Sequence, residues 1–172
     1  EVEDFVGINS VEQFIGDTAI AKGYKFEAGP ETGKKVAIIG GGPAGMAAAY
    51  QLRRKGHGAT IFDDNAELGG MMRYGIPDFK MEKHVVERRV RQMEAEGVTF
   101  HCNVEIGKDR MISSLEGDYD AVLLAGGAEE PRNLPVPGRE LDGIHFAMDF
   151  LPQQNRRVGG ETISPKGTDE TA

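Results

Sequence analysis

The hydrophobic residues of this chain follow two alternating patterns, short continuous runs and longer runs with helical spacing. Runs of four or five apolar residues are typical of strands buried on both faces of a parallel sheet. Residues 44–55 follow the first run and residues 81–96 the second, and each places its apolar side chains on one side, which predicts helices that cover a sheet. The order of strands and helices predicts an α/β fold with a doubly wound parallel sheet, built on a Rossmann-like βαβ unit. The strands predicted in this way are 35–39, 59–62, 98–102 and 121–125.

The region before the first strand carries the pattern of one helix and a linker. Ser10 and Gln13 have the spacing of a capping box, which predicts a helix over residues 11–22 that ends at Gly23. Its apolar residues form a single stripe, so we expect this helix to pack on another part of the protein. Residues 24–34 contain a Gly-Pro pair and are predicted to be a linker.

The remaining segments give weaker signals. Residues 64–80 are rich in glycine and predict a loop with little regular structure, whereas residues 112–115 predict a short turn of helix. Residues 131–138 are rich in proline and predict a loop, and residues 143–151 predict a helix. From Pro152 onward the chain is polar, and its last six residues, GTDETA, are typical of a disordered end.

The turn after the first strand carries the most specific chemical signal. Gly40, Gly42 and Gly45 have the spacing G-x-G-x-x-G between a strand and a helix, which is the arrangement of dinucleotide-binding sites. In such a turn the first glycine allows the tight bend, and the second lets a pyrophosphate approach the backbone. Gly45 and Ala49 let the helix lie close to the strand, and the helix N-terminus directs N–H groups at the phosphates.

An acid, Asp63, ends the second strand 18 residues after Gly45 and can accept hydrogen bonds from a ribose. FAD and nicotinamide cofactors both carry that ribose. The Gly69-Gly70 pair favours FAD, because its backbone can run close beside an extended cofactor and a plain nicotinamide site does not need such a loop. The fourth strand ends in the small residues 125–127, which leave room for a ligand at the switch point of the sheet.

Composition narrows the class of protein. The 172 residues are 39% hydrophobic and 28% charged, which suits a soluble globular protein, and they include 24 glycines. The net charge of −8 argues against nonspecific binding to nucleic acid or to an anionic membrane.

No apolar run approaches the roughly 20 residues that span a bilayer, and no secretory signal is present, so we expect a cytoplasmic protein. A single cysteine, Cys102, provides neither an internal disulfide nor the ligands of an iron–sulfur cluster. Because the chain begins with Glu1, we expect an excerpt or processed form of a longer protein.

Several stretches together resemble a known family. They are VAIIGGGPAGMAAAYQL, LGGMMRYGIPDFKMEK, GVTFHCNVEIGKD, YDAVLLAGGAEEPRNLPVPG and GIHFAMDFLPQ, which lie between residues 34 and 154. The chain is similar to the flavin domain of the glutamate synthase small subunit, a group that also includes the flavin domain of dihydropyrimidine dehydrogenase. The stretch over residues 69–80, with GIPDFK, is the specific part, since many flavoproteins share the first motif.

The resemblance implies FAD, with its pyrophosphate over residues 42–45 and its adenosine ribose held by Asp63. It also implies that residues 64–71 run along the cofactor, that Lys80 lies near the flavin and that the backbone of Val104 meets the adenine. Gly126 stands where many relatives have threonine, so a hydroxyl contact is lost there. The expected cofactor-binding residues are Gly40, Gly42, Pro43, Ala44, Gly45, Asp63, Asp64, Glu67, Gly69, Gly70, Met71, Lys80, Val104, Ala125, Gly126 and Gly127.

In this family electrons pass from NADPH or NADH to FAD, and then to iron–sulfur clusters and a partner. The resemblance therefore implies an FAD-dependent NAD(P)H oxidoreductase whose partner is the glutamate synthase large subunit or another reductase. No Ser-His-Asp group, carboxylate pair or metal-ligand spacing is present, so we name no catalytic side chain and no metal ligand. The residues after Arg157 contain no second glycine motif for a nicotinamide, so we expect the isolated chain to be an incomplete enzyme.

We therefore divide the chain into three parts. Residues 1–33 are an N-terminal helical segment and linker, residues 34–151 the N-terminal part of an FAD-binding Rossmann-like domain, and residues 152–172 a polar tail where the NAD(P)H domain begins in relatives. Two other interpretations stay open. One is a dinucleotide-binding module without turnover that serves as a structural or assembly subunit. The other is a bare NAD-binding dehydrogenase domain, which the Gly69-Gly70 loop disfavours.

Overall fold

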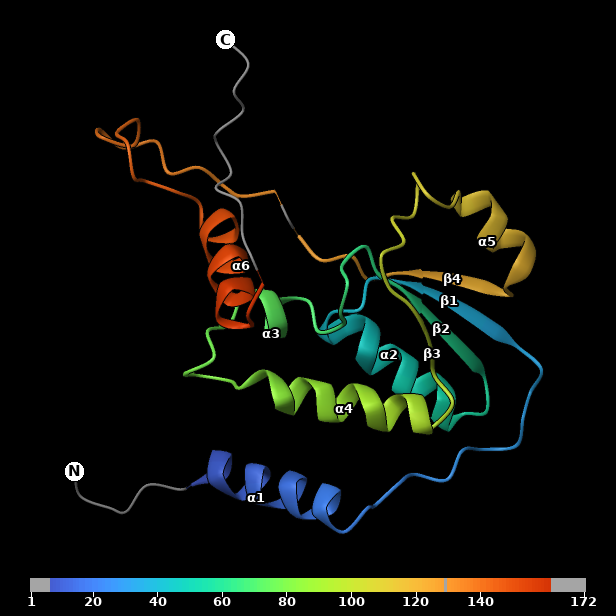
Figure 1. The fold of residues 1–172 in the computed structure, drawn as a ribbon. Coiled ribbons are helices and arrows are strands. Elements are labelled where there is room, and N and C mark those ends of the chain that lie inside the picture. The colour runs from blue at the N-terminus through green and yellow to red at the C-terminus, as the bar shows by residue number, and fades with distance from the viewer. Residues whose placement is uncertain (1–6, 129, 162–172) are drawn as a thin grey trace.

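A four-stranded parallel sheet forms the centre of the protein, in the order β3-β2-β1-β4 (Figure 1). The computed structural model describes residues 7–128 and 130–161. All three strand pairs are parallel, which confirms the predicted doubly wound α/β fold. Each predicted strand is present, with ends that differ by at most one residue. The strands are β1 (Lys35–Ile39), β2 (Gly58–Phe62), β3 (Thr99–His101) and β4 (Ala121–Leu124).

Helices cover both faces of this sheet. The first layer contains α2 (Pro43–Arg54) and α4 (Lys83–Ala95), and α5 (Ile112–Asp118) lies on the other face (Figure 1). Consecutive strand residues point to opposite faces, so Ile38 packs with the first layer and Ala37 with α5. Both side chains are fully buried, which explains why β1 reads as a continuous apolar run. The helix predicted over residues 112–115 is therefore confirmed and is three residues longer.

Strand β4 differs from the prediction of a fully buried strand. It pairs with β1 along one edge, and within residues 7–128 and 130–161 no strand pairs with its other edge. Leu124 is 70% exposed and Leu123 is 38% exposed. An apolar run indicates a strand that is suited to burial, but it does not show whether other strands or helices lie beside that strand. The prediction of burial was wrong for that reason.

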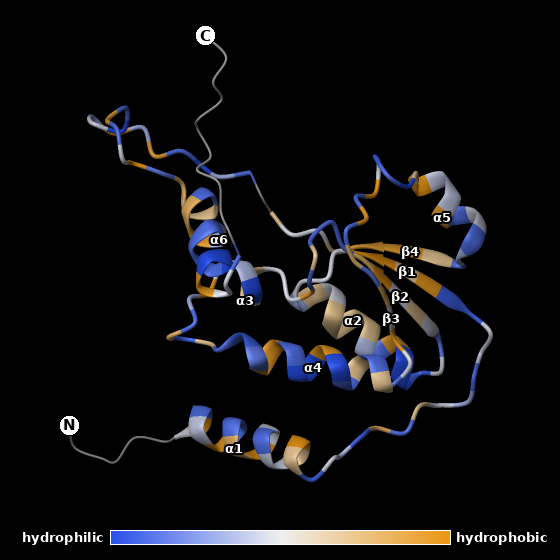
Figure 2. Cartoon of the chain, in the orientation of Figure 1, coloured by the Kyte–Doolittle hydropathy of each residue, from blue (hydrophilic) through white to orange (hydrophobic). Residues whose placement is uncertain are grey.

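The N-terminal helix α1 (Ile8–Ala21) begins three residues before the predicted start. Ser10 lies inside the helix and its Oγ donates to the carbonyl of Gly7, so the predicted capping box does not form. The apolar stripe is present but exposed, with Phe14 71% accessible, and Figure 2 shows its hydrophobic colour facing away from the sheet layers. Amphipathic spacing predicts an apolar face and not its partner, so the expected packing is absent from the described residues.

Two segments contain more helix than the sequence predicted. The short helix α3 (Met71–Tyr74) lies inside the segment predicted to be loop, directly after Gly70. Helix α6 (Ala147–Val158) begins four residues later than predicted and continues through Pro152, so part of the predicted polar tail is helical. Asn155 anchors α6, because its buried amide donates to the Tyr74 carbonyl at 2.8 Å. The predicted disorder of GTDETA concerns residues outside those described.

The two predicted connections are confirmed, since residues 24–34 and 131–138 contain neither helix nor strand. Within the part of the chain that the structure describes, no helix has the length and apolar character needed to cross a membrane. The same residues contain no cluster of three or more histidine, cysteine or acidic side chains that is suited to a metal ion.

Candidate functional site

Four segments meet at the carboxyl end of the sheet. They are the glycine turn after β1, the end of β2, the loop before α3 and the end of β4. The amide of Gly69 donates to the Gly41 carbonyl at 2.9 Å, and the amide of Ala125 donates to the Ile39 carbonyl at 2.7 Å. The meeting point lies where β1 has β2 on one side and β4 on the other, which is the switch point at which open α/β sheets bind ligands.

Two glycines of the turn are required by the chain itself. Gly40 has a φ of +107°, and an added Cβ would clash with the carbonyl of Ala125. An added Cβ at Gly45 would clash with the carbonyl oxygen of Gly40, so only glycine lets α2 approach the turn so closely. Helix and strand packing alone explains both residues.

Gly42 is not required in this way. Its φ of −75° and ψ of −174° are ordinary extended values that any residue adopts. A Cβ added there would meet only the Cα of Gly70, at 3.9 Å. Beside Gly42 there is open space, and the uncapped N-terminus of α2 begins next to it with Pro43. Free N–H groups and the positive end of a helix dipole favour an anionic group in this space.

Asp63 ties the end of β2 to the glycine turn. Its side chain is buried, with 8% exposed. The Gly41 amide donates to Asp63 Oδ2 at 2.5 Å, and the Asn65 amide donates to Oδ1 at 2.9 Å. Each carboxylate oxygen has a further lone pair, so these bonds leave acceptor capacity for a hydroxyl group.

The glycine pair before α3 lies directly against the turn. Gly70 has a φ of +49°, and an added Cβ would stand 2.8 Å from the Cα of Gly42. Gly69 has a φ of +129°, and a Cβ there would stand 2.8 Å from Val86. Leu68 covers Gly41 from the same loop. This backbone therefore forms one wall of the space beside Gly42, and its approach to a cofactor stays a prediction.

Arg73 is a residue of this region that the sequence did not point out. Its side chain is 9% exposed and lies between the loop and α4. Nε donates to the Leu68 carbonyl at 2.8 Å, and Nη1 donates to Glu67 Oε2 at 2.5 Å. A single arginine after a glycine loop has no periodicity or spacing of its own, so no sequence pattern marked it.

Comparison with known proteins agrees with this geometry. A family model described as pyridine nucleotide-disulphide oxidoreductase matches residues 34–157. The chain belongs to this family.

The resemblance to glutamate synthase small subunits is also confirmed. The NADPH glutamate synthase small chain of Mycobacterium tuberculosis (strain H37Rv) is 48% identical over 94% of this chain and 33% of its own length. The NADH glutamate synthase of Schizosaccharomyces pombe is 46% identical over 98% of this chain and 8% of its own length. The chain thus spans about one third of the first relative.

Solved structures share the fold. The structure of Mycobacterium tuberculosis FprA in complex with NADPH matches with a TM-score of 0.60 and 30% identity, over 71% of this chain and 29% of that chain. The match leaves the larger part of FprA without a counterpart here.

Most of the residues predicted for the cofactor gather at this end of the oxidoreductase domain. Ala125 lies beside Gly40, and Gly126 follows with no other atom within 4 Å of an added Cβ. Gly127 has a φ of +80°. The Val104 amide donates to the Asp63 carbonyl at 2.9 Å, so the Val104 carbonyl is the backbone group left for a ligand.

Other predicted residues are placed less directly. The Glu67 carboxylate accepts a hydrogen bond from Arg73, so it contributes to holding the loop and is not directed at the space beside Gly42 by this contact. Met71 is 51% exposed. Pro43, Ala44 and Asp64 are exposed, the first two at the start of α2. Lys80 is exposed on the turn before α4, where its amide donates to the Pro77 carbonyl at 2.9 Å.

Cys102 lies close enough to two acidic residues of the site for their charges to change the pKa of its thiol. Burial raises the pKa of its thiol above the usual value, and the negative charges of Asp63 and Glu67 raise this pKa further, while Arg73 lowers it. The thiolate is therefore disfavoured at neutral pH. Cys102 is a small, half-buried residue directly after β3.

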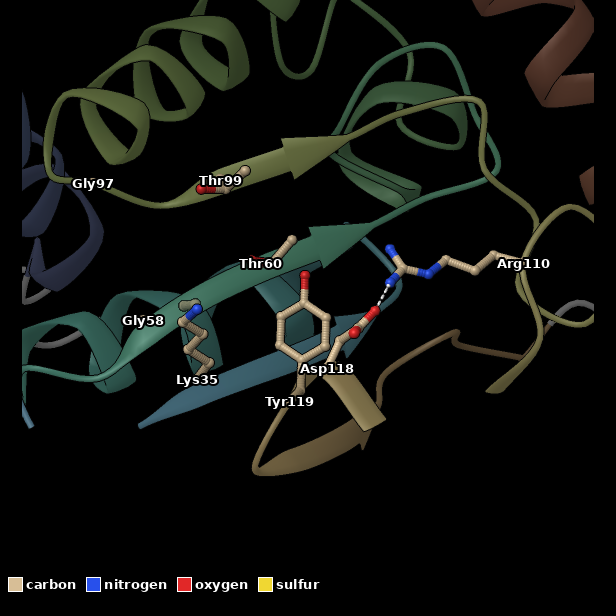
Figure 3. Close-up of a pocket in the computed structure, with 9 residues that line it drawn as sticks. Lys35, Gly58, Thr60, Gly97, Thr99, Arg110, Asp118 and Tyr119 are labelled. Atoms are coloured by element: carbon tan, nitrogen blue, oxygen red, sulfur yellow. Dashed lines mark hydrogen bonds and ion pairs between the residues drawn. The ribbon is translucent and has the colours of Figure 1, made fainter. Parts of the chain in front are cut away.

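A separate hollow of about 510 Å³ lies at the opposite end of the sheet (Figure 3). The first residues of three strands line it, namely Lys35, Gly58 and Thr99. Its arginine, Arg110, is already paired with Asp118 at 2.6 Å. The glycine turn contributes no residue to this hollow, so the hollow is separate from the predicted cofactor-binding residues.

Proposed function

We propose that this chain binds FAD in the space beside Gly42, as the FAD-binding portion of an NAD(P)H-dependent oxidoreductase of the glutamate synthase small-chain type. The observation that carries the proposal is Gly42 itself. Neither its backbone conformation nor the packing around it requires glycine, whereas both neighbouring glycines of the motif are required. A ligand that fills the open space would explain why position 42 is a glycine.

The residues at the carboxyl end of the sheet fit an extended dinucleotide. The α2 N-terminus provides the N–H groups of Gly42 and Ala44 and the positive end of the helix dipole for a pyrophosphate, while Pro43 has no N–H and begins the helix between them. Asp63 is an acceptor for the ribose hydroxyls, and the Val104 carbonyl is an acceptor beside it for the adenine. When bound, FAD supplies hydride and electron transfer, and the chain supplies binding, orientation and exclusion of water.

The longer relatives suggest how electrons reach and leave this site. Their printed names include both NADPH and NADH glutamate synthases, so we propose a nicotinamide donor without choosing between the two. A small chain implies a larger partner, and we propose the glutamate synthase large subunit or another reductase as electron acceptor. The iron–sulfur clusters that link the two are expected on other segments, since one cysteine holds no cluster. A cytoplasmic location stays a prediction.

Ligand identification tests the proposal. The purified 172-residue chain, incubated with excess FAD and desalted, should be yellow and should release FAD on heating, with the mass of FAD and not of FMN or NAD. Reduction of the bound flavin by dithionite should bleach the visible band. An empty or NAD-loaded protein after this treatment would contradict the proposal, and a bound flavin that resists reduction would favour the structural-subunit interpretation.

A further inference from the structure

Arg73 has the contacts of a residue that holds one wall of the site in place. It lies on α3, and only 9% of its side chain is exposed. The guanidinium donates to the Leu68 carbonyl at 2.8 Å and to the Glu67 carboxylate at 2.5 Å. On its other side, Glu87 of α4 stands 3.7 Å away. The cation therefore joins the loop before α3 to the body of the domain.

The backbone that Arg73 holds is the one that borders the open space. The carbonyl that it binds belongs to Leu68, which is followed by the Gly69 amide on the Gly41 carbonyl. The next residue, Gly70, packs on the Cα of Gly42. The carbonyl that the guanidinium binds is thus separated by Gly69 alone from Gly70, the residue that packs on Gly42.

The geometry of the contact favours arginine over lysine. A buried cation is costly unless charged and hydrogen-bonding partners surround it, so a guanidinium in this place is retained for the contacts that it makes. Its planar fork serves a carbonyl and a carboxylate at the same time, which a lysine ammonium on a flexible stem does not reproduce in the same geometry.

We propose that Arg73 is a positioning residue, which holds the loop 67–70 against the glycine turn and thereby shapes the space beside Gly42 for a dinucleotide pyrophosphate. The proposal rests on the FAD site proposed above. Arg73 acts on the loop and not on the ligand in this proposal, because its Nε and Nη1 are directed at Leu68 and Glu67. Its effect on binding passes through the backbone of Gly69 and Gly70.

Arg53 provides a closely matched control within the same chain. Its side chain is 14% exposed, its Nε donates to the Glu96 carbonyl at 3.1 Å, and its guanidinium pairs with Glu31. The two arginines thus share burial, a backbone carbonyl and a glutamate partner. Arg53 lies at the far end of α2, where it joins the linker to the end of α4.

The test compares Arg73→Lys with Arg53→Lys in the full chain. FAD affinity is measured by quenching of flavin fluorescence, and hydrogen exchange of the Gly69 amide is measured without FAD. We expect Arg73→Lys to weaken FAD binding about tenfold and to speed exchange at Gly69, since one charge-assisted bond is lost. Arg53→Lys should lower the unfolding midpoint while leaving FAD affinity and Gly69 exchange unchanged.

Equal FAD affinity and equal Gly69 exchange in the wild type and Arg73→Lys would overturn the proposal. If the wild type binds no FAD, the FAD site fails, and the exchange measurement still decides whether Arg73 holds the loop. Should Arg73→Lys not fold, Glu67→Gln removes the charge of the partner at a half-exposed position. Faster Gly69 exchange in that variant supports the positioning role, and unchanged exchange overturns it.

Discussion

Both ends of the sheet have space beside them, but side chains border the space at the amino end and backbone borders it at the carboxyl end. At the amino end, side chains such as those of Thr99 and Tyr119 line the hollow, and Arg110 is paired there with Asp118. At the carboxyl end, backbone lines the space, because Gly42, Gly70 and Gly126 contribute no side chains. Conformation and packing require glycine at position 70 but not at positions 42 and 126. Glycine that the fold does not require, and not the volume of a cavity, therefore indicates a site for an extended cofactor.

The largest expected effect separates the glycines of the turn from one another. Gly45→Ala should destabilise the fold by about 3 kcal/mol, because its Cβ would overlap the Gly40 carbonyl in a closely packed contact. Urea unfolding of the variant measures this loss. Gly117→Ala in α5 is the control, because nothing lies within 4 Å of its added Cβ and alanine favours a helix by up to about 1 kcal/mol. Equal stability of the two variants would contradict the packing role of Gly45.

A second comparison uses two aspartates that bind backbone amides at opposite ends of β1. Asp63→Ala should weaken FAD binding by about 1.5–3 kcal/mol, because a charged acceptor for the ribose is lost. Asp120 accepts the Lys35 amide at 2.8 Å at the amino end, so Asp120→Ala should leave FAD affinity unchanged. Isothermal titration with FAD measures both. Equal losses in the two variants would remove the distinction between the ends.

The thiol of Cys102 reports on the acids of the site. Its raised pKa predicts slow alkylation by iodoacetamide at pH 8 relative to a free cysteine peptide, since the thiolate is scarce. Asp63→Asn removes one of the charges that raise this pKa, so alkylation should become faster and its pH profile should shift downward. A profile that does not change would show that Asp63 does not act on this thiol.

The smallest expected effect concerns acid stability at the amino end. The Lys34 side chain and then the Lys35 amide hold the pKa of Asp120 below its ordinary value of 3.8. A lowered carboxyl pKa in the folded state stabilises the protein above the ordinary value, and this contribution is lost as the pH falls below it. The stability difference between wild type and Asp120→Asn should therefore shrink between about pH 4 and pH 2. A constant difference over that range would contradict this.

The sequence predicted those parts of the fold that follow from local apolar pattern. β1 was predicted with its observed ends, and β2, β3 and β4 within one residue, because each is a short apolar run. The glycine turn and Asp63 were predicted to hold different parts of one dinucleotide, and in the structure they lie together, because the Gly41 amide donates to Asp63. The strand positions follow from the local sequence and need little information about contacts between distant residues.

The parts that the sequence missed depend on neighbours. The exposure of Leu124 follows from the absence of a further strand beside β4 within the described residues. The continuation of α6 past Pro152 follows from the contact of Asn155 with Tyr74, 81 residues earlier. Arg73 was missed for the same reason, because its partners on the loop and α4 are known only once the chain has folded.

The affinity of Gly42→Val for FAD is the most direct test of the proposed cofactor site. Valine at this position has an allowed backbone conformation and open space, so the variant should fold as the wild type does, with an unchanged unfolding midpoint. Gly117→Val, which adds the same side chain in open space on α5, is the matched control. We predict no measurable FAD binding by Gly42→Val and unchanged binding by Gly117→Val. A folded Gly42→Val variant that binds FAD as tightly as the wild type would contradict the account.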